Sequence, residues 1–191
     1  MTRTVRVAYL FVLTAVVGAP SLFAQAVDKR PLEIADYRLW RTIEGAAISD
    51  DGRWTAWTYS KVRGDDTLAV RSLDTKARHD IPRASDGVLS SDGAWVAYSL
   101  APDFREIERL ERDGDPVPRQ AGLMNLLTGE VLTWDDADSF GFSETGSHFF
   151  VKKRQTNDDA DHDGTDLILR NLREGYQELV GSVADLAFND A

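Results

Sequence analysis

Short apolar runs alternate with polar turns along most of the chain, and one arrangement of the two occurs three times. An apolar residue is followed by Ser, a polar pair and Gly, and then by apolar side chains at every second position. The copies begin at Ile48, Leu89 and Phe142, and Phe188 opens a partial fourth. Period-two alternation indicates a half-buried β-strand, and Gly tolerates the positive φ of a tight turn.

A second apolar element recurs inside each period, at 68–75, 121–129 and 167–175, and a turn and another short apolar run follow it. Each period therefore holds about four strands, which is the unit of a β-propeller blade in TolB-like and WD40-like repeats. The pattern predicts an all-β fold, a partial β-propeller of about three four-stranded antiparallel blades over 46–191. The expected boundaries are 46–85, 86–137 and 138–184, with the start of a fourth blade at 185–191.

Recurrence at matched positions also predicts which large side chains are buried. The expected core consists of Trp54, Trp57, Trp95, Tyr98, Phe142, Phe149, Leu73, Leu126 and Leu172. Ahead of the repeats, in the segment 27–45, apolar residues follow Asp36 at helical spacing. This spacing predicts a short helix from Asp36 to Ile43 that ends at Gly45 and packs Leu39, Trp40 and Ile43 on the first sheet.

The first residues have the pattern of a secretory signal peptide. Two arginines, Arg3 and Arg6, precede an apolar run over 7–17, and a small-x-small site ends at Ala26. The apolar run is too short for a stable membrane span, so no stable membrane anchor is expected. The pattern predicts that residues 1–26 are removed after Ala26 and that the protein is periplasmic or secreted.

Charge and cysteine content narrow the choice of partners. The chain has 22 basic and 32 acidic residues, a formal net charge of −10, and no cysteine. Such an acidic chain is poorly suited to phosphate backbones, which argues against nucleic acid as a partner. Without cysteine there is neither a disulfide nor a lipid attachment site, so the core alone must hold the fold.

The segment Tyr37–Gly45, followed by the first turn at Ile48–Trp54, resembles the start of secreted bacterial peptidases of the prolyl oligopeptidase family. The resemblance implies a β-propeller that gates peptide substrates for an α/β-hydrolase peptidase domain outside this chain. The Ser-x-Asp-Gly turn is shared with TolB-like periplasmic binding propellers, which have no catalysis and remain the alternative. The predicted helix before the first turn favours the peptidase. The chain stops inside a turn, so we expect it to be the front part of a longer protein.

Two polar stretches are candidates for a further role. In 101–120, Phe104, Ile107 and Leu110 recur at helical spacing, which predicts a short amphipathic helix closed by Gly114. In the dipeptidyl-peptidase branch of the family, acidic residues on such an excursion hold the amino terminus of the substrate. The match here is not residue by residue, so that role is not transferred and a solvated helix is favoured.

The stretch 157–166 is the most acidic of the chain. Its residues Asp159, Asp161, Asp163 and Gly164 match the first half of a calcium loop, but Arg170 stands where a bidentate Glu is needed. A polar loop is therefore favoured over a calcium site.

Catalytic chemistry is not apparent in these residues. No G-x-S-x-G motif occurs, and His79, His148 and His162 lie in different polar segments without a recognisable nucleophile. No phosphate loop, dinucleotide fingerprint or zinc-protease motif is present. We therefore assign no catalytic, cofactor-binding or metal-binding residue and expect no cofactor. Whether the chain belongs to an enzyme depends on a catalytic domain elsewhere.

Overall fold

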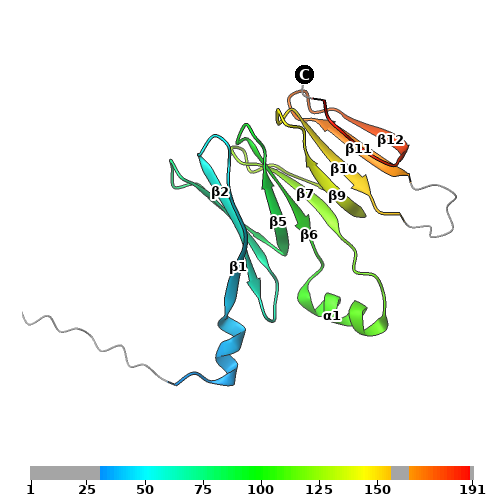
Figure 1. The fold of residues 1–191 in the computed structure, drawn as a ribbon. Helices are drawn as coiled ribbons and strands as arrows, with labels where there is room; N and C mark the ends of the chain where they lie inside the picture. Colours follow the sequence, from blue (N-terminus) through cyan, green and yellow to red (C-terminus); the bar gives the residue numbers. More distant parts are fainter. Residues whose placement is uncertain (1–30, 156–163, 190–191) are drawn as a thin grey trace, which may run out of the picture. The chain divides into compact units, whose positions relative to one another are not determined.

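The computed structural model describes residues 31–155 and 164–189, and Figure 1 shows how their elements are arranged. All described helices and strands belong to one compact unit, Glu33–Ala191. The predicted signal peptide, 1–26, lies outside the described residues. So do most of the acidic loop, 156–163, and the last two residues, 190–191.

The described strands form three four-stranded antiparallel sheets, each with its strands paired in chain order. Blade 1 contains β1 (Arg41–Ile48), β2 (Trp54–Lys61), β3 (Thr67–Ser72) and β4 (Arg78–Pro82). Blade 2 contains β5 (Ala84–Leu89), β6 (Trp95–Leu100), β7 (Gln120–Asn125) and β8 (Val131–Trp134). Blade 3 contains β9 (Ala137–Phe142), β10 (His148–Lys153), β11 (Thr165–Asn171) and β12 (Gln177–Val183). The predicted all-β class and the four-stranded blade are confirmed.

A buried serine organises the first turn of each blade. The hydroxyls of Ser49, Ser90 and Ser143 accept the N–H of the first residue of the next strand at 3.0, 2.9 and 3.0 Å. These serines are 5%, 1% and 8% exposed. Each hydroxyl therefore takes the place of water as the hydrogen-bond acceptor for a backbone N–H at the edge of the core. Each copy of the sequence repeat thus forms the same hydrogen bond from the next strand to its serine.

The aligned leucines share a backbone contact but differ in burial. The N–H groups of Leu73, Leu126 and Leu172 donate to equivalent carbonyls of the preceding turn at 2.8, 2.9 and 2.9 Å. Leu126 is 3% exposed and packs with Leu68 and Val70 of blade 1. Leu172 is partly buried against the core between blades 2 and 3. Leu73 is 54% exposed, so its predicted burial is wrong. Leu126 and Leu172 pack at the preceding blade, whereas no described blade precedes blade 1.

The hydrophobic cores lie between neighbouring blades. Ala56 and Val70 of blade 1 meet Val96 and Tyr98 of blade 2 in the first core, and Phe149 of blade 3 is central to the second. Tyr98 and Phe149 are each 1% exposed, as predicted. The other aromatic residues of the predicted core are only partly buried, namely Trp54, Trp57, Trp95 and Phe142.

The segment before the repeats differs from its prediction. A 3₁₀ helix, η1, covers Ile34–Leu39, and residues 41–48 form strand β1, so the predicted helix from Asp36 to Ile43 is wrong in type and extent. Ile43 pairs with Tyr59 of β2 and is 62% exposed. Leu39 and Trp40 are also exposed, at 72% and 49%, and do not form the predicted packing on the first sheet. Local spacing favoured a helix, but β2 supplies backbone partners for most of residues 41–48.

Gly45 has a structural role other than the predicted helix end. It lies in the irregular stretch of β1 between Glu44 and Ala47, with φ +58°. Asp86 has φ 54° in the corresponding irregular stretch of β5. The positive φ therefore recurs with the repeat, and Gly45 meets a conformational need of the strand.

Candidate functional site

The two ends of the strands carry different kinds of connection. Six turns of five residues each join strands at one end, which we call the turn edge, at 49–53, 73–77, 90–94, 126–130, 143–147 and 172–176. The register places the connections 62–66, 83, 101–119 and 135–136 at the opposite end, the loop edge, where β10 also ends and β11 begins. Variable loops on a rigid scaffold commonly carry function, so the loop edge is the candidate site.

Helix α1 (Phe104–Asp113) is the longest element that the structure describes on the loop edge, and Figure 1 shows it beyond the ends of the blade 2 strands. The predicted amphipathic helix is confirmed. The Asp103 carboxylate accepts the N–H groups of Arg105 and Glu106, and Gly114, with φ 76°, closes the helix. The apolar side chains of Phe104, Ile107 and Leu110 are only partly buried.

The β2–β3 hairpin of blade 1 holds the start of α1. The carboxylate of Asp65 accepts the Phe104 N–H at 2.7 Å. Arg63 forms an ion pair with Glu108 at 2.8 Å, and its guanidinium lies 5.9 Å from the centre of the Phe104 ring. Three contacts therefore connect the excursion of blade 2 to blade 1.

Two of the four acidic residues of α1 pair within the helix. Arg109 pairs with Glu106 at 2.7 Å and with Asp113 at 3.3 Å. The hydrogen bond from Arg109 lowers the pKa of Glu106. These intrahelical pairs agree with the solvated helix favoured from the sequence.

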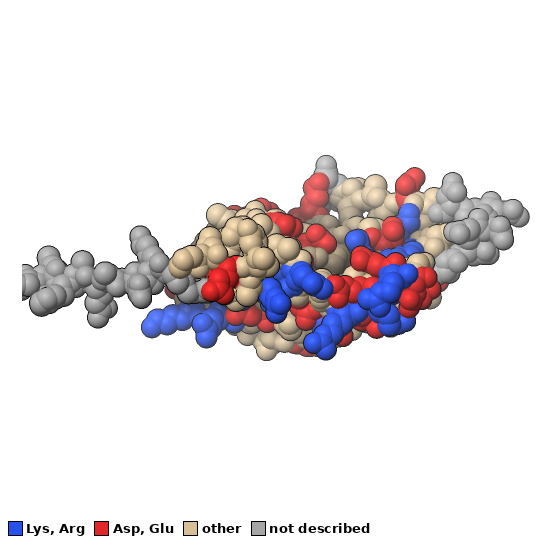
Figure 2. Space-filling view, turned by 90° about the horizontal axis from the view of Figure 1, so that it is seen from below, with Lys and Arg blue, Asp and Glu red and all other residues tan. Residues whose placement is uncertain are grey.

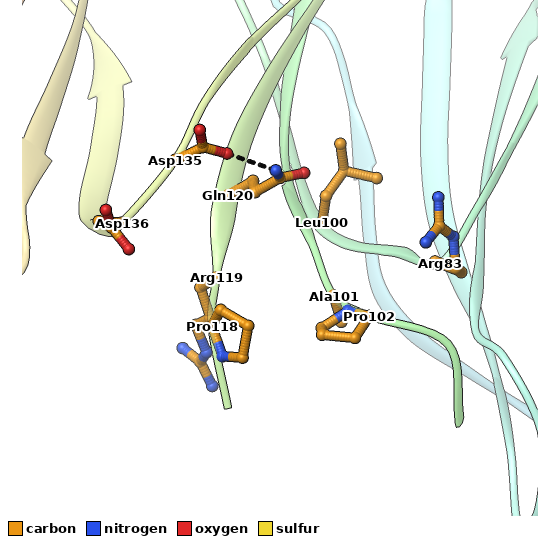
Figure 3. Close-up of a pocket in the computed structure, with 9 residues that line it drawn as sticks. All are labelled: Arg83, Leu100, Ala101, Pro102, Pro118, Arg119, Gln120, Asp135 and Asp136. Carbon is orange, nitrogen blue, oxygen red and sulfur yellow. Dashed lines mark hydrogen bonds between the residues drawn. The ribbon is translucent and has the colours of Figure 1, made fainter. Parts of the chain in front are cut away.

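A pocket of about 410 Å³ opens on the loop edge, and Figure 3 shows its lining. The walls come from the junctions between blades and from the two ends of the α1 excursion. The lining residues are Arg83, Leu100, Ala101, Pro102, Pro118, Arg119, Gln120, Asp135 and Asp136.

Backbone hydrogen bonds at the blade junctions fix the backbone of this pocket. The N–H of Ala101 donates to the carbonyl of Arg83 at 3.0 Å, and Ala137 donates in the same way to Arg119 at 3.0 Å. Arg154 N–H donates to the Asp136 carbonyl at 2.8 Å. Arg83 and Asp136 occupy equivalent junctions in the repeat, and both have positive φ, at 62° and 54°. Because this conformation is costly for residues other than glycine, surrounding contacts must maintain it.

Both signs of charge line the pocket. Asp135 accepts a hydrogen bond from Gln120 at 2.5 Å, and its backbone carbonyl accepts one from the Lys153 ammonium. In the described part of the chain, no ion pair joins the side chains of Arg83, Arg119 or Asp136 to another residue. Figure 2, a view from the side on which α1 lies, shows basic and acidic side chains interspersed over this surface.

The structure brings a serine and a histidine together at the turn edge, which was not foreseen. Ser147 Oγ lies 2.9 Å from Nδ1 of His148, and Asn171 Nδ2 lies 3.4 Å from Nε2 of the same ring. The pair lines an open hollow of about 560 Å³. Only the adjacency of the two residues in the sequence could have indicated it.

The hydrogen bonds around this pair do not activate the serine. The Asn171 side-chain oxygen accepts the N–H groups of Arg173 and Glu174, so its amide nitrogen must face His148. The imidazole Nε2 is then an acceptor, and Nδ1 carries the proton that is donated to Ser147. A general base would need the opposite tautomer.

His79 has other neighbours. His79 lies beside Trp54, with ring centres 5.8 Å apart, and its Nε2 lies 3.2 Å from the carbonyl oxygen of Leu126. His162 and the central acidic loop lie outside the described residues. Among the residues that the structure does describe, no three His, Asp or Glu side chains form a metal-binding group. No described helix has the length and apolar character needed to span a membrane.

Comparison with known proteins establishes the fold. No known family profile and no curated protein matches the chain. Among solved structures, it is similar to the β-propeller domain of the Trilobed protease from Pyrococcus furiosus, with 15% identity and a TM-score of 0.52. This similarity covers 75% of the present chain and 43% of that chain.

Two further solved structures are also similar. The acylaminoacyl peptidase of Pyrococcus horikoshii has 13% identity and a TM-score of 0.49, over 77% of this chain and 26% of that one. Prolyl oligopeptidase B from Galerina marginata has 14% identity and a TM-score of 0.49, over 74% and 22%. The chain therefore spans less than half the length of each. The match to the Trilobed protease confirms that the three blades have a β-propeller fold.

Proposed function

We propose that this chain is the substrate-gating propeller portion of a secreted serine peptidase of the prolyl oligopeptidase family. Peptide hydrolysis would be carried out by an α/β-hydrolase domain outside these residues. The observation that carries the proposal is the likeness of the three blades to the propeller domain of a protease. The resemblance of Tyr37–Trp54 to the start of such peptidases supports it.

The difference between the two edges agrees with a gating role. A gate needs a rigid scaffold and, on one side, loops that meet the peptide. The turn edge consists of uniform five-residue turns, whereas the loop edge carries α1 and the charged pocket.

The described residues give no support for hydrolysis by this chain alone. Acyl transfer at a serine needs a general base within reach and donors for the oxyanion, all held together. Ser147 is next to His148, but the neighbouring amide of Asn171 fixes the unproductive tautomer. We therefore expect the nucleophile to lie in the hydrolase domain.

A fluorophosphonate serine probe tests the proposal. The intact protein should hydrolyse proline-containing chromogenic peptides, and the probe should label a serine outside these 191 residues. The present chain, assayed alone, should give neither hydrolysis nor labelling. No labelling of the intact protein would favour the TolB-like binding propeller, and labelling of Ser147 would contradict the tautomer argument.

Export is a separate part of the proposal and is tested separately. The charged start, the apolar run over 7–17 and the small-x-small site support cleavage after Ala26. Amino-terminal sequencing of the protein recovered from the periplasm or the medium should then begin at Val27. Recovery of uncleaved protein from the cytosol alone would contradict export.

A further inference from the structure

The loop-edge pocket has opposite charges at its two sides. Figure 3 shows Asp136 and Arg83 at opposite sides of the pocket, with Leu100, Ala101 and Pro102 from one wall lying between them. Arg119 lines the same space, and Figure 3 shows it nearer to Asp136 than to Arg83. The two junction residues are equivalent in the repeat, yet one is basic and the other acidic.

We propose that this pocket binds a short peptide that has a free carboxylate and, further along, a positive charge. The carboxylate would lie with Arg83, and the positive group would lie toward Asp135 and Asp136. This inference rests on the proposed function, because it names the class of peptide that the propeller admits. The positive group can be an amino terminus or a basic side chain, since both present an ammonium or guanidinium donor to a carboxylate.

The mixture of charges argues against simpler ligands. A phosphate or another multivalent anion would be attracted by the arginines but repelled by Asp135 and Asp136 in the same pocket. A simple cation would be attracted by the aspartates but repelled by the arginines. A ligand with both charges, separated along its length, satisfies both sides, and the apolar wall can accept the peptide between them.

The charged groups are available and their backbones are held in place. Arg83, Arg119 and Asp136 have no ion-pair partner within the described ranges, so a ligand need not displace one. Backbone hydrogen bonds to Arg83 and Asp136 fix the chain at each junction. Preorganised groups lose less entropy on binding, which favours a ligand over solvent.

Peptide titrations of the full chain, followed by NMR, test the proposal. The probes are Ala-Ala-Ala, its carboxyl amide, its N-acetyl form, the doubly blocked form, and acetyl-Lys-Ala-Ala. The free tripeptide should shift the amide signals of Ala101, Gln120 and Ala137. Removal of either charge should weaken binding by about two- to fivefold, as expected for exposed ion pairs. Acetyl-Lys-Ala-Ala should bind better than N-acetyl-Ala-Ala-Ala if a side chain can supply the positive charge.

Two variants test which residue of the pocket recognises each charge of the peptide. Arg83→Gln should bind the free tripeptide and its carboxyl amide with nearly equal affinity while still favouring the free amino terminus. Asp136→Asn should lose only the preference for positive charge. The turn-edge variants Arg173→Gln and Asp74→Asn remove the same charges elsewhere and should change neither preference. Circular dichroism checks that each variant is folded.

Several results would overturn the inference. They are no binding at millimolar peptide, equal binding of the doubly blocked peptide, and unchanged selectivity in both pocket variants. The outcome is separable from that of the proposed function. If the probe labels the intact protein but this chain binds no peptide, the pocket inference fails alone. If the chain binds peptides but the intact protein is never labelled, the peptidase proposal fails alone.

Discussion

Replacing Asp65 by alanine would remove the carboxylate that connects the β2–β3 hairpin to the first turn of α1. The lost contact is the 2.7 Å hydrogen bond from the Phe104 N–H, a group that helix geometry leaves without an intrahelical partner. Loss of such a cap costs about 0.5–2 kcal/mol. We therefore expect a local loss of about 1 kcal/mol, which is about a fivefold increase in the population of opened α1.

The ion pair in the same region should contribute less. The side chains of Arg63 and Glu108 are 67% and 38% exposed, so solvent screens their attraction and an exposed pair contributes about 0.2–1 kcal/mol. Glu108→Gln should therefore be milder than Asp65→Ala and should lose its effect at high salt. Asp65→Asn, which keeps a side-chain oxygen acceptor, should lie close to the original protein.

Hydrogen–deuterium exchange of the full chain is the suitable assay. Helix α1 contains no fully buried residue, so it should open without the blades. In Asp65→Ala, exchange should become faster at the amides of α1 and stay unchanged in β6 and β7. Glu130→Ala, an exposed acid on the turn edge, is the matched control. Equal effects of alanine and asparagine at position 65, or faster exchange throughout blade 2, would refute the capping argument.

Three further predictions concern stability and ionisation. Leu126→Ala should destabilise the protein by about 2–5 kcal/mol in urea unfolding. Leu73→Ala should cost less than about 1 kcal/mol, because that leucine is 54% exposed. Similar losses in the two variants would contradict the inference that, of these two leucines, only Leu126 packs on a preceding blade. Asp86→Gly should stabilise by about 1 kcal/mol, because a positive φ of 54° is costly for aspartate; a lower urea midpoint would argue against this. Hydrogen bonds from the Ser49 hydroxyl and a backbone N–H lower the pKa of Asp51 to about 2. The stabilisation from Asp51 should thus be present above pH 4 and lost as the pH falls toward 2, and Ser49→Ala should raise this pKa in an NMR titration.

The blades could be predicted from the sequence because their signals are local. The serine, the glycine and the alternating strand lie within about ten residues of one another, and the turn hydrogen bonds follow from that spacing. Helix α1 was predictable for the same reason, since its apolar spacing and its Gly114 end are properties of one short segment.

Features that depend on distant partners were not predictable. The sequence around Asp36–Ile43 fits a helix, and only pairing with β2 makes residues 41–48 a strand. Leu73 and Leu126 have the same local setting, and only the presence of a preceding blade buries the second. Likewise, Asn171 selects the tautomer of His148 from another strand.

The pocket depends on the tertiary structure most of all. Arg83 and Asp136 are far apart in the chain, and neither lies in a recognisable motif. The sequence by itself determined the repeating blade, because strand alternation and turn chemistry act between near neighbours. The tertiary structure decided which side chains are buried and which charges share a pocket, because burial and electrostatic attraction depend on distance in space.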